Sequence, residues 1–213
     1  PYRKQWLEAI IKEITQLQTR QTYEIVARNT LPRGRRPISG KMVLAVKRND
    51  DGTIKKFKAR YVAHGFRQSE GFDYHTTYAP VVATTTVRMI LAHAMYNQND
   101  LHQLDIAGAF LLSDVDSAIW MDPDKSVRKL MALDEQEVIK LKKGLYGLKQ
   151  SAMLWHKDFN KGMKKLGFKQ EQTADLCAYT KVVPGKGRII VAVHVDDCII
   201  SCTKGQGLAE QFK

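Results

Sequence analysis

Cysteine and long apolar runs are scarce in this 213-residue sequence, and each scarcity narrows the class of protein. The three cysteines, Cys177, Cys198 and Cys202, are an odd number without metal-ligand spacing, so they indicate neither a disulfide framework nor a zinc site. Cys198 and Cys202 lie in an apolar stretch and are predicted to be core residues of a protein from a reducing compartment. No run approaches the roughly 18 uncharged apolar residues of a transmembrane helix.

The two ends of the sequence lack the marks of a complete protein. The start, PYRKQWLEAI, has no initiator Met and no signal-peptide hydrophobic segment, and the end, LAEQFK, stops inside an expected helix. We therefore expect a fragment of a longer chain. With 44% hydrophobic and 26% charged residues, this fragment is predicted to be globular and not disordered.

Acidic residues are outnumbered by basic ones, 22 against 34, and the excess is uneven. Residues 1–100 hold 17 Lys and Arg against 8 Asp and Glu, a net charge of +9, whereas residues 101–213 hold 17 against 14. Residues 33–67 alone hold 11 basic and 2 acidic residues. Such a stretch indicates contact with a phosphate backbone, and the alternative is a solvated, lysine-rich surface.

Hydrophobic periodicity predicts an antiparallel sheet flanked by helices, which is an α+β fold. One predicted hairpin, with strands 42–47 and 53–62 around an Asn-Asp-Asp-Gly turn, carries most of the basic excess. A second hairpin is predicted within RIIVAVHVDDCIISC, residues 188–202. The other expected elements are helices within 5–18, 84–100, 142–168 and 203–213, a strand within 101–110, and a short strand near AIWM in the polar stretch 113–143.

Two adjacent aspartates, Asp196 and Asp197, stand at the tip of the second predicted hairpin. Burying both without compensation would cost several kcal/mol. Turn aspartates usually have Gly, Asn or Pro beside them, whereas Val195 and Cys198 flank this pair. The pattern therefore indicates either an unusual turn or a bound cation. Asp105 ends another predicted strand; if the strands are neighbours, three carboxylates meet, as in the Mg²⁺ sites of phosphoryl transfer.

Five segments in order extend this interpretation: KFKARYVAHGF, YAPVVATTTVRMIL, LHQLDIAGAFL, GLYGLKQSAMLWH and VAVHVDDCII. Together they resemble the reverse transcriptase of Ty1/copia-type retrotransposons, over nearly the whole chain. The resemblance implies an RNA-directed DNA polymerase with the fingers and palm of a right-hand polymerase. It implies a ferredoxin-like antiparallel palm sheet with flanking helices, and a chain that ends before the thumb. The expected divisions are fingers 1–85 and 121–147, and palm 86–120 and 148–213.

The resemblance also implies roles for the acidic residues. Asp105 and Asp196 match the first and second catalytic aspartates, and Asp197 matches the third acidic residue. Together they are expected to bind two Mg²⁺ ions, with Mn²⁺ as a substitute. His194 matches the residue that lies against the primer terminus.

Further residues match the nucleotide site of the family. Phe110 matches the aromatic steric gate that leaves no room for a 2′-hydroxyl, and Ala109 matches the pocket for the 3′-hydroxyl. Tyr146, Gly147 and Gln150 match the segment under the incoming nucleotide and template base. The fingers residues that hold the triphosphate are matched by Lys47, Lys58 and Arg60.

The sequence departs from the family pattern at several positions. His194 stands in place of an aromatic Tyr or Phe, and Ala152 and Met153 stand in place of Pro and Arg. Gly108 replaces the more usual Thr or Ser, and Met42 replaces a Trp. These differences leave two answers for His194: tolerated variation, or decay of a genomic copy.

Three functions stay open from the sequence. The first is the polymerase, whose implied partners are an RNA or DNA template with primer, deoxynucleoside triphosphates, and the remaining polyprotein with its thumb, ribonuclease H and integrase. The second is a decayed relic that only binds nucleic acid, and the third is a carboxylate-metal nuclease. No membrane partner is expected. The resemblance implies cytoplasmic virus-like particles, although no targeting signal specifies a location.

Overall fold

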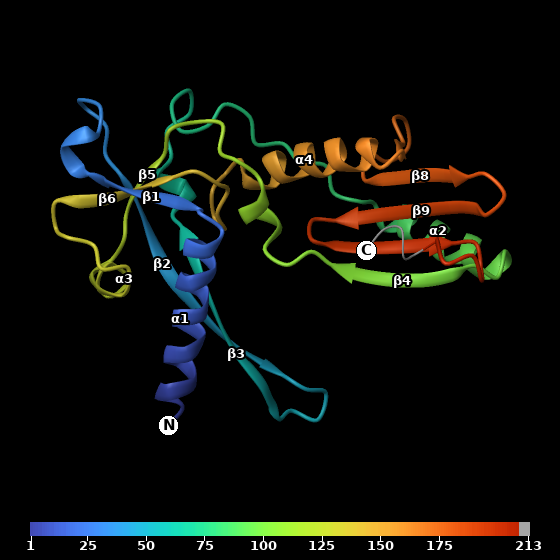
Figure 1. Ribbon diagram of the computed structural model, residues 1–213, viewed down its shortest axis with the longest axis horizontal. Helices are drawn as coiled ribbons and strands as arrows, with labels where there is room; N and C mark the ends of the chain where they lie inside the picture. Colours follow the sequence, from blue (N-terminus) through green and yellow to red (C-terminus); the bar gives the residue numbers. More distant parts are fainter. Residues whose placement is uncertain (209–213) are drawn as a thin grey trace. The chain divides into compact units, whose positions relative to one another are not determined.

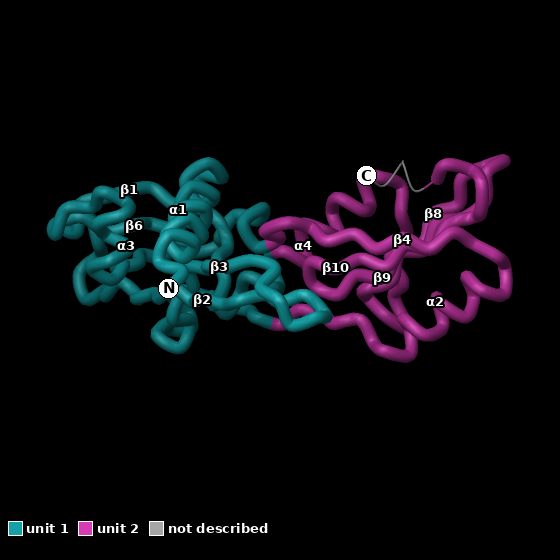
Figure 2. The backbone as a smooth tube through the Cα atoms, turned by 90° about the horizontal axis from the view of Figure 1, so that it is seen from below, with its two compact units in different colours: residues 1–77, 110–154 teal, residues 78–109, 155–213 magenta. Residues whose placement is uncertain are grey.

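The chain divides into two compact units and passes between them at three points (Figure 2). The structure, a computed structural model, describes residues 1–208. Unit 1 contains residues 1–77 and 110–154, and unit 2 contains residues 78–109 and the described residues from 155 onward. The sequence placed the corresponding divisions after residues 85, 120 and 147. Residues 110–120 join unit 1 because Leu111 and Ile119 are buried in its core.

Unit 1 combines a five-stranded sheet with helices α1 (Arg3–Thr19) and α3 (Lys125–Leu130) (Figure 1). The strand order is β1-β6-β5-β2-β3, and only β2 and β5 of the neighbouring pairs run parallel. Ile14 and Leu17 of α1 are buried in the core, as the helical spacing predicts. The strands are β1 (Tyr23–Ala27), β2 (Ile38–Arg48), β3 (Ile54–Ala63), β5 (Trp120–Asp122) and β6 (Glu137–Leu141).

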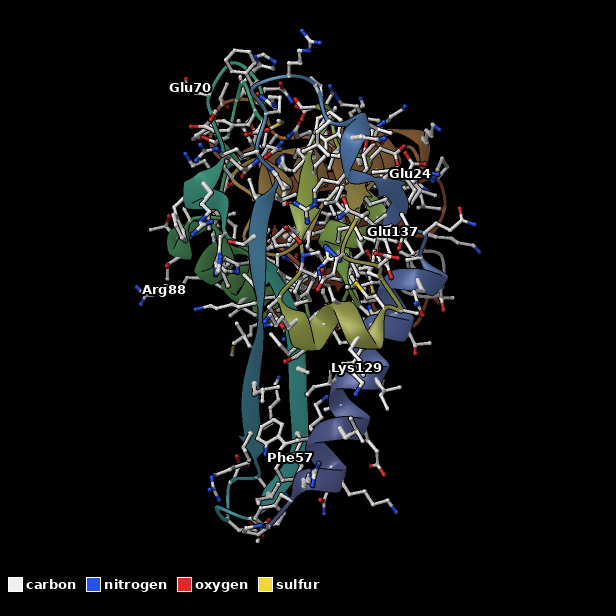
Figure 3. The ribbon with its side chains drawn as sticks, turned by 90° about the vertical axis from the view of Figure 1, so that its left-hand side faces the viewer. Glu24, Phe57, Glu70, Arg88, Lys129 and Glu137 are labelled. Carbon is white, nitrogen blue, oxygen red and sulfur yellow. The ribbon has the colours of Figure 1, made fainter. Side chains whose placement is uncertain are left out.

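The β2–β3 hairpin has two chemically different faces, because side chains alternate along each strand. On one face, the Phe57 ring (Figure 3) contacts Trp6 of α1 and Tyr2 just before it, with ring centroids 4.6 Å and 5.3 Å apart, respectively. Val46 pairs with Phe57 and therefore shares this apolar face. The predicted hairpin is confirmed: β2 extends beyond both ends of the predicted strand 42–47, and β3 is shifted by one residue from the predicted 53–62.

Unit 2 contains an all-antiparallel sheet of order β4-β10-β9-β8-β7. Since β4 and β9 both run antiparallel to β10, they are parallel to each other, and α4 lies in the connection between them. Helix α2 packs against β9 and β10. The elements are α2 (Thr84–Tyr96), β4 (Asp100–Asp105), α4 (Ser151–Lys165), β7 (Lys169–Gln170), β8 (Ala178–Val183), β9 (Gly187–His194) and β10 (Asp197–Cys202).

The structure confirms the α+β class and corrects several local predictions. In helix α2 the apolar spacing would also place Leu91 and Met95 on the inward side, but these residues are 37% and 79% exposed. The buried stripe is Thr86, Ile90 and Ala94, because only positions four apart reach the sheet. The polar stretch 113–143 contains α3 and β6 as well as the predicted short strand β5.

Helix α3 has a local signal that the sequence analysis missed. The Asp124 carboxylate caps it by accepting from the Ser126 and Val127 amides at 2.9 and 3.1 Å. The helix predicted within 203–213 lies partly outside the described residues. The three cysteines are free and buried, and for Cys198 and Cys202 this confirms the predicted core position. Within residues 1–208, no helix has both the length and the apolar character needed to cross a membrane.

Candidate functional site

The three predicted catalytic aspartates lie at one end of the unit 2 sheet. In the β9–β10 hairpin, His194 pairs with Asp197, so Val195 and Asp196 form a two-residue turn. On its other side, Asp197 pairs with Asp105 at the end of β4. The Ile106 amide donates to the Asp196 carbonyl oxygen at 2.8 Å and extends this pairing into the turn. The register thus joins stretches that are far apart in the sequence.

This pairing sets two like charges side by side. Directly paired residues of an antiparallel ladder lie on one face, so His194, Asp197 and Asp105 form a row across three strands. All three side chains are exposed, and Asp196 is half-buried. Opposed carboxylates repel each other, and a divalent cation would relieve that repulsion.

The donor chemistry of this edge fits Mg²⁺, which prefers hard oxygen ligands. Among residues 1–208, however, no group of three or more His, Cys, Asp and Glu side chains is already disposed to hold a metal ion. The backbone therefore gathers the aspartates, while convergence of their oxygens on an ion would require side-chain rotation.

The turn that carries Asp196 has an unusual backbone. Val195 has φ +59°, in the left-handed region that β-branched residues rarely adopt. A positive φ at the first central residue and a negative φ at the second is the sign pattern of a type II′ hairpin turn, which normally has Gly first. The Trp155 indole N–H donates to the Val195 carbonyl oxygen at 2.6 Å.

Cys198, the residue after the acidic pair, holds the same hairpin in the core of unit 2. Its side chain is fully buried, and burial raises the pKa of the thiol to about 12, with a further contribution from the charges of Asp197 and Asp196. At neutral pH this residue is an uncharged apolar anchor beside an exposed acidic turn.

The predicted triphosphate-binding residues share one face of the β2–β3 hairpin in unit 1. Val43 pairs with Arg60, Ala45 with Lys58, and Lys47 with Lys56. Since side chains alternate, this face lies opposite the one that packs on α1. We call it the basic face; its cationic residues are Lys41, Lys47, Lys56, Lys58 and Arg60.

A buried carboxylate supports this hairpin from α1. Glu13 is 8% exposed, and one of its oxygens accepts from the Tyr61 amide at 2.9 Å. Burial raises the pKa of Glu13, opposed by that hydrogen bond and by the charges of Arg60 and Lys58. The sequence placed Glu13 on a helix, but nothing in its periodicity distinguished it from a surface glutamate.

Three predicted nucleotide-site residues contact one another in series within unit 1. The Arg60 guanidinium lies 4.6 Å from the Tyr146 ring centroid, and Tyr146 meets Phe110 edge-on at 5.1 Å. Both rings are half-buried, so each keeps an accessible surface. Ala109, the residue before Phe110, is buried.

Gly147 lies where two segments of unit 1 cross. Its φ is +88°, and a Cβ added there would come within 2.1 Å of the Ala63 carbonyl oxygen. A Cβ on Gly65 would come within 2.1 Å of the Gly147 oxygen, so both glycines are needed for the crossing. The Ala63 amide donates to the Tyr146 backbone carbonyl oxygen at 2.8 Å, and this hydrogen bond joins the two segments at the crossing.

Gln150 is fully buried in unit 1. Its side-chain N–H groups donate to the Asp73 carbonyl oxygen at 2.6 Å, and its side-chain oxygen accepts from Gln68 at 2.9 Å. Gln68 in turn accepts from the Lys149 amide at 2.8 Å. Gln150 therefore braces the loop that carries Tyr146 and offers no exposed surface to a nucleotide.

Sequence reasoning missed the residues that support the site through buried polar contacts. Gln68 and Asp73 lie in HGFRQSEGFDY, whose composition is that of any polar loop. Trp155 has the helical spacing of an ordinary apolar residue in its helix, and nothing in the sequence indicates a role for its indole N–H. The acidic row belongs to unit 2, and the basic face belongs to unit 1.

Comparison with known proteins assigns the chain to a protein family. The model of the family described as reverse transcriptase (RNA-dependent DNA polymerase) matches residues 20–213. The chain belongs to the reverse transcriptase family. Curated relatives identify it further as a reverse transcriptase domain of the Ty1/copia type, which confirms the resemblance seen in the sequence.

Several relatives of this reverse transcriptase domain are retrotransposon polyproteins. The chain is 34% identical over 213 residues, its full length, to the retrovirus-related Pol polyprotein from transposon TNT 1-94 of Nicotiana tabacum. It is 31% identical over 162 residues, 75% of the chain, to that from transposon RE1 of Arabidopsis thaliana, and 27% identical over 207 residues, 93% of the chain, to the transposon Ty1-H Gag-Pol polyprotein of Saccharomyces cerevisiae. The chain spans 16%, 11% and 10% of these relatives, respectively.

Proposed function

We propose that this reverse transcriptase domain adds deoxynucleotides to a primer 3′-hydroxyl under the direction of an RNA or DNA template. The observation that carries the proposal is the pairing of Asp105 with Asp197 across β4 and β10, with Asp196 in the adjoining turn. Three carboxylates at one sheet edge are the donor set that a divalent-cation site for phosphoryl transfer requires.

In this proposal Asp105, Asp196 and Asp197 hold two Mg²⁺ ions, or Mn²⁺ in their place. When bound, such ions supply Lewis-acid activation of the 3′-hydroxyl and charge stabilisation on the phosphates. The chain's own contribution is positional: the β4–β10 ladder fixes Asp105 against Asp197, and the Ile106 amide ties down the Asp196 backbone. His194, at the end of the same row, stacks against the primer terminus.

The basic face binds the negatively charged partners. Lys47, Lys58 and Arg60 point from one side of a rigid two-stranded ribbon, so several cations reach a triphosphate or a template backbone together. Because phosphate contacts carry no sequence information, binding is expected to be indifferent to template sequence.

Phe110 discriminates between sugars by shape in this proposal. Its ring is held at the edge by Tyr146, and a flat ring under the sugar leaves no room for a 2′-hydroxyl. Ala109 borders the 3′-hydroxyl pocket, and Gly147 lets the loop with Tyr146 approach the base pair. Gln150 acts indirectly, through the buried hydrogen bonds that brace this loop.

We equate unit 1 with the fingers and unit 2 with the palm of a right-hand polymerase. The split β-α-β arrangement of β4, α4 and β9 around β10 supports a ferredoxin-like palm. The further partners in this proposal are the primer–template duplex and the remaining polyprotein, including a thumb, ribonuclease H and integrase, in cytoplasmic virus-like particles.

A second candidate, a relic that binds nucleic acid without polymerising, is favoured by one observation. His194 replaces the family aromatic and stands exposed in the same row as Asp197 and Asp105. Its imidazole is smaller than the ring of the family's Tyr or Phe and offers less surface for stacking against the primer terminus.

Primer extension separates the two candidates. The chain, joined to a family thumb, is tested on an RNA template with Mg²⁺ and deoxynucleotides, beside its Asp196→Asn and His194→Tyr variants. The polymerase predicts extension by the parent that the Asp196→Asn change abolishes. Extension by the His194→Tyr variant alone supports the relic. Silence from all three, with salt-sensitive template binding retained, refutes polymerase activity in this chain.

A further inference from the structure

Trp155 makes a contact with the acidic hairpin that its place in a helix core does not require. Its indole N–H donates to the carbonyl oxygen of Val195, the first residue of the two-residue turn, at 2.6 Å. We propose that Trp155 is a positioning residue that holds this turn in its strained conformation and thereby sets the carboxylates of Asp196 and Asp197. This inference rests on the proposed function for its catalytic meaning, but the contact itself stands within unit 2.

The turn needs such a restraint because its backbone is unfavourable for its sequence. Val195 has φ +59°, and valine in the left-handed region crowds its branched Cβ against the backbone. Strain of this kind persists only where surrounding structure over-determines the conformation. A short hydrogen bond to the strained residue's own carbonyl is a direct restraint on the peptide plane that leads into Asp196.

The indole is itself held firmly, as a positioning residue must be. Trp155 is 7% exposed, and its ring lies 5.5 Å from Phe159, one turn later on α4. Phe159 meets Tyr179 of β8 edge-on at 5.6 Å. Three rings therefore tie α4 to the sheet that carries the acidic turn, and the N–H is the polar end of this stack.

The conformation of this turn also determines the geometry around the acidic row. The Asp196 carbonyl oxygen accepts from the Ile106 amide at 2.8 Å, one residue beyond Asp105. If the Val195–Asp196 peptide changed its orientation, this hydrogen bond and the pairing of Asp105 with Asp197 would both be disturbed. The Ile106 amide is therefore a reporter of the turn that needs neither metal nor substrate.

The test is a double-mutant cycle on the chain without metal, with amide hydrogen exchange at Ile106 as the readout. Trp155→Phe keeps an aromatic ring and removes the hydrogen-bond donor. We expect about fivefold faster exchange at the Ile106 amide, the factor that corresponds to the loss of one hydrogen bond. Val195→Gly relieves the strain, so adding Trp155→Phe in that background should change the exchange less than twofold. The matched control is Trp6→Phe in unit 1, which should leave Ile106 unaffected.

A purely structural tryptophan gives a different pattern. Exchange would then rise across the sheet, including Val191 in the middle of β9, and equally in both backgrounds; that result overturns the proposal, as does no change at Ile106. Should Trp155→Phe fail to fold, 3-benzothienylalanine at position 155 keeps the indole shape without the N–H and takes its place in the cycle.

Mn²⁺ binding, followed by electron paramagnetic resonance, connects the turn to the acidic row. We expect Trp155→Phe to weaken Mn²⁺ binding about fivefold, with recovery in the Val195→Gly background. An unchanged affinity refutes the effect on the carboxylates. Mn²⁺ binding that is absent in the parent, or that survives Asp196→Asn unchanged, refutes the proposed metal site instead, while hydrogen exchange still judges the turn.

Discussion

Replacing Gly147 with alanine should destabilise unit 1 for two separable reasons. The first is conformational: φ is +88°, and an L-residue in a left-handed conformation costs roughly 1–2 kcal/mol. The second is steric, because the new Cβ would lie 2.1 Å from the Ala63 carbonyl oxygen. To relieve the clash the segments must separate, which breaks the 2.8 Å hydrogen bond from Ala63 to Tyr146 at about 1 kcal/mol and adds overpacking strain of about 1–3 kcal/mol.

Two further glycines separate these contributions. Gly34 has φ +81° and no atom within 4 Å of an added Cβ, so Gly34→Ala reports the conformational cost alone, about 1–2 kcal/mol. Gly65 has no positive φ, but its Cβ would lie 2.1 Å from the Gly147 oxygen, so Gly65→Ala reports the steric cost, about 2–4 kcal/mol.

Urea unfolding followed by circular dichroism measures the free energy of unfolding of all three variants against the parent. We expect Gly147→Ala to lose about 3–6 kcal/mol, the sum of the two contributions, which is exceptional for a single substitution. A loss no larger than that of Gly34→Ala would refute the close crossing of the two segments.

Three other predictions follow from the described contacts. Phe110→Ala should raise incorporation of ribonucleotides relative to deoxynucleotides by about 10- to 100-fold in single-nucleotide extension, and an unchanged ratio would count against the aromatic gate. Glu13 has a raised pKa in the folded state, so its contribution to stability is present at acid pH and is lost as the pH rises through that pKa. The urea midpoint of Glu13→Gln minus that of the parent should therefore be larger at pH 7 than at pH 4. A smaller difference at pH 7 would contradict the burial of Glu13. Cys198, with its pKa near 12, has about one thiolate in ten thousand at pH 8, so iodoacetamide should label it only after unfolding; rapid labelling of the folded chain would refute its burial.

Local chemistry was enough to predict the two hairpins from the sequence. The alternation of Lys with apolar residues in KKFKARYV encodes a strand with one basic side, and Asn-Asp-Asp-Gly encodes its turn. The acidic pair between two apolar strands likewise identified the β9–β10 hairpin. Ordered motifs along the chain identified the family, because a family pattern is a property of sequence alone.

Residues that act through distant partners were beyond such reasoning. Gln150 looked like a nucleotide contact, yet it is buried against Gln68 and Asp73, and no periodicity encodes a buried amide network. Gly147 was predicted only as part of the nucleotide segment, and nothing in the sequence indicated a role for Gly65; their close approach to each other appears only in the structure. Met95 belongs to the apolar stripe of α2 by its spacing, but it is exposed because the sheet covers only part of that stripe.

The sequence by itself determined which residue types this domain brings to its candidate site and on which local elements they stand. Only the tertiary structure decided that Asp105 pairs with Asp197, that Arg60, Tyr146 and Phe110 form one stack, and that Trp155 donates to Val195. The reason is physical: propensity and alternation act over a few residues, whereas strand register and helix–sheet contacts depend on how whole apolar faces pack.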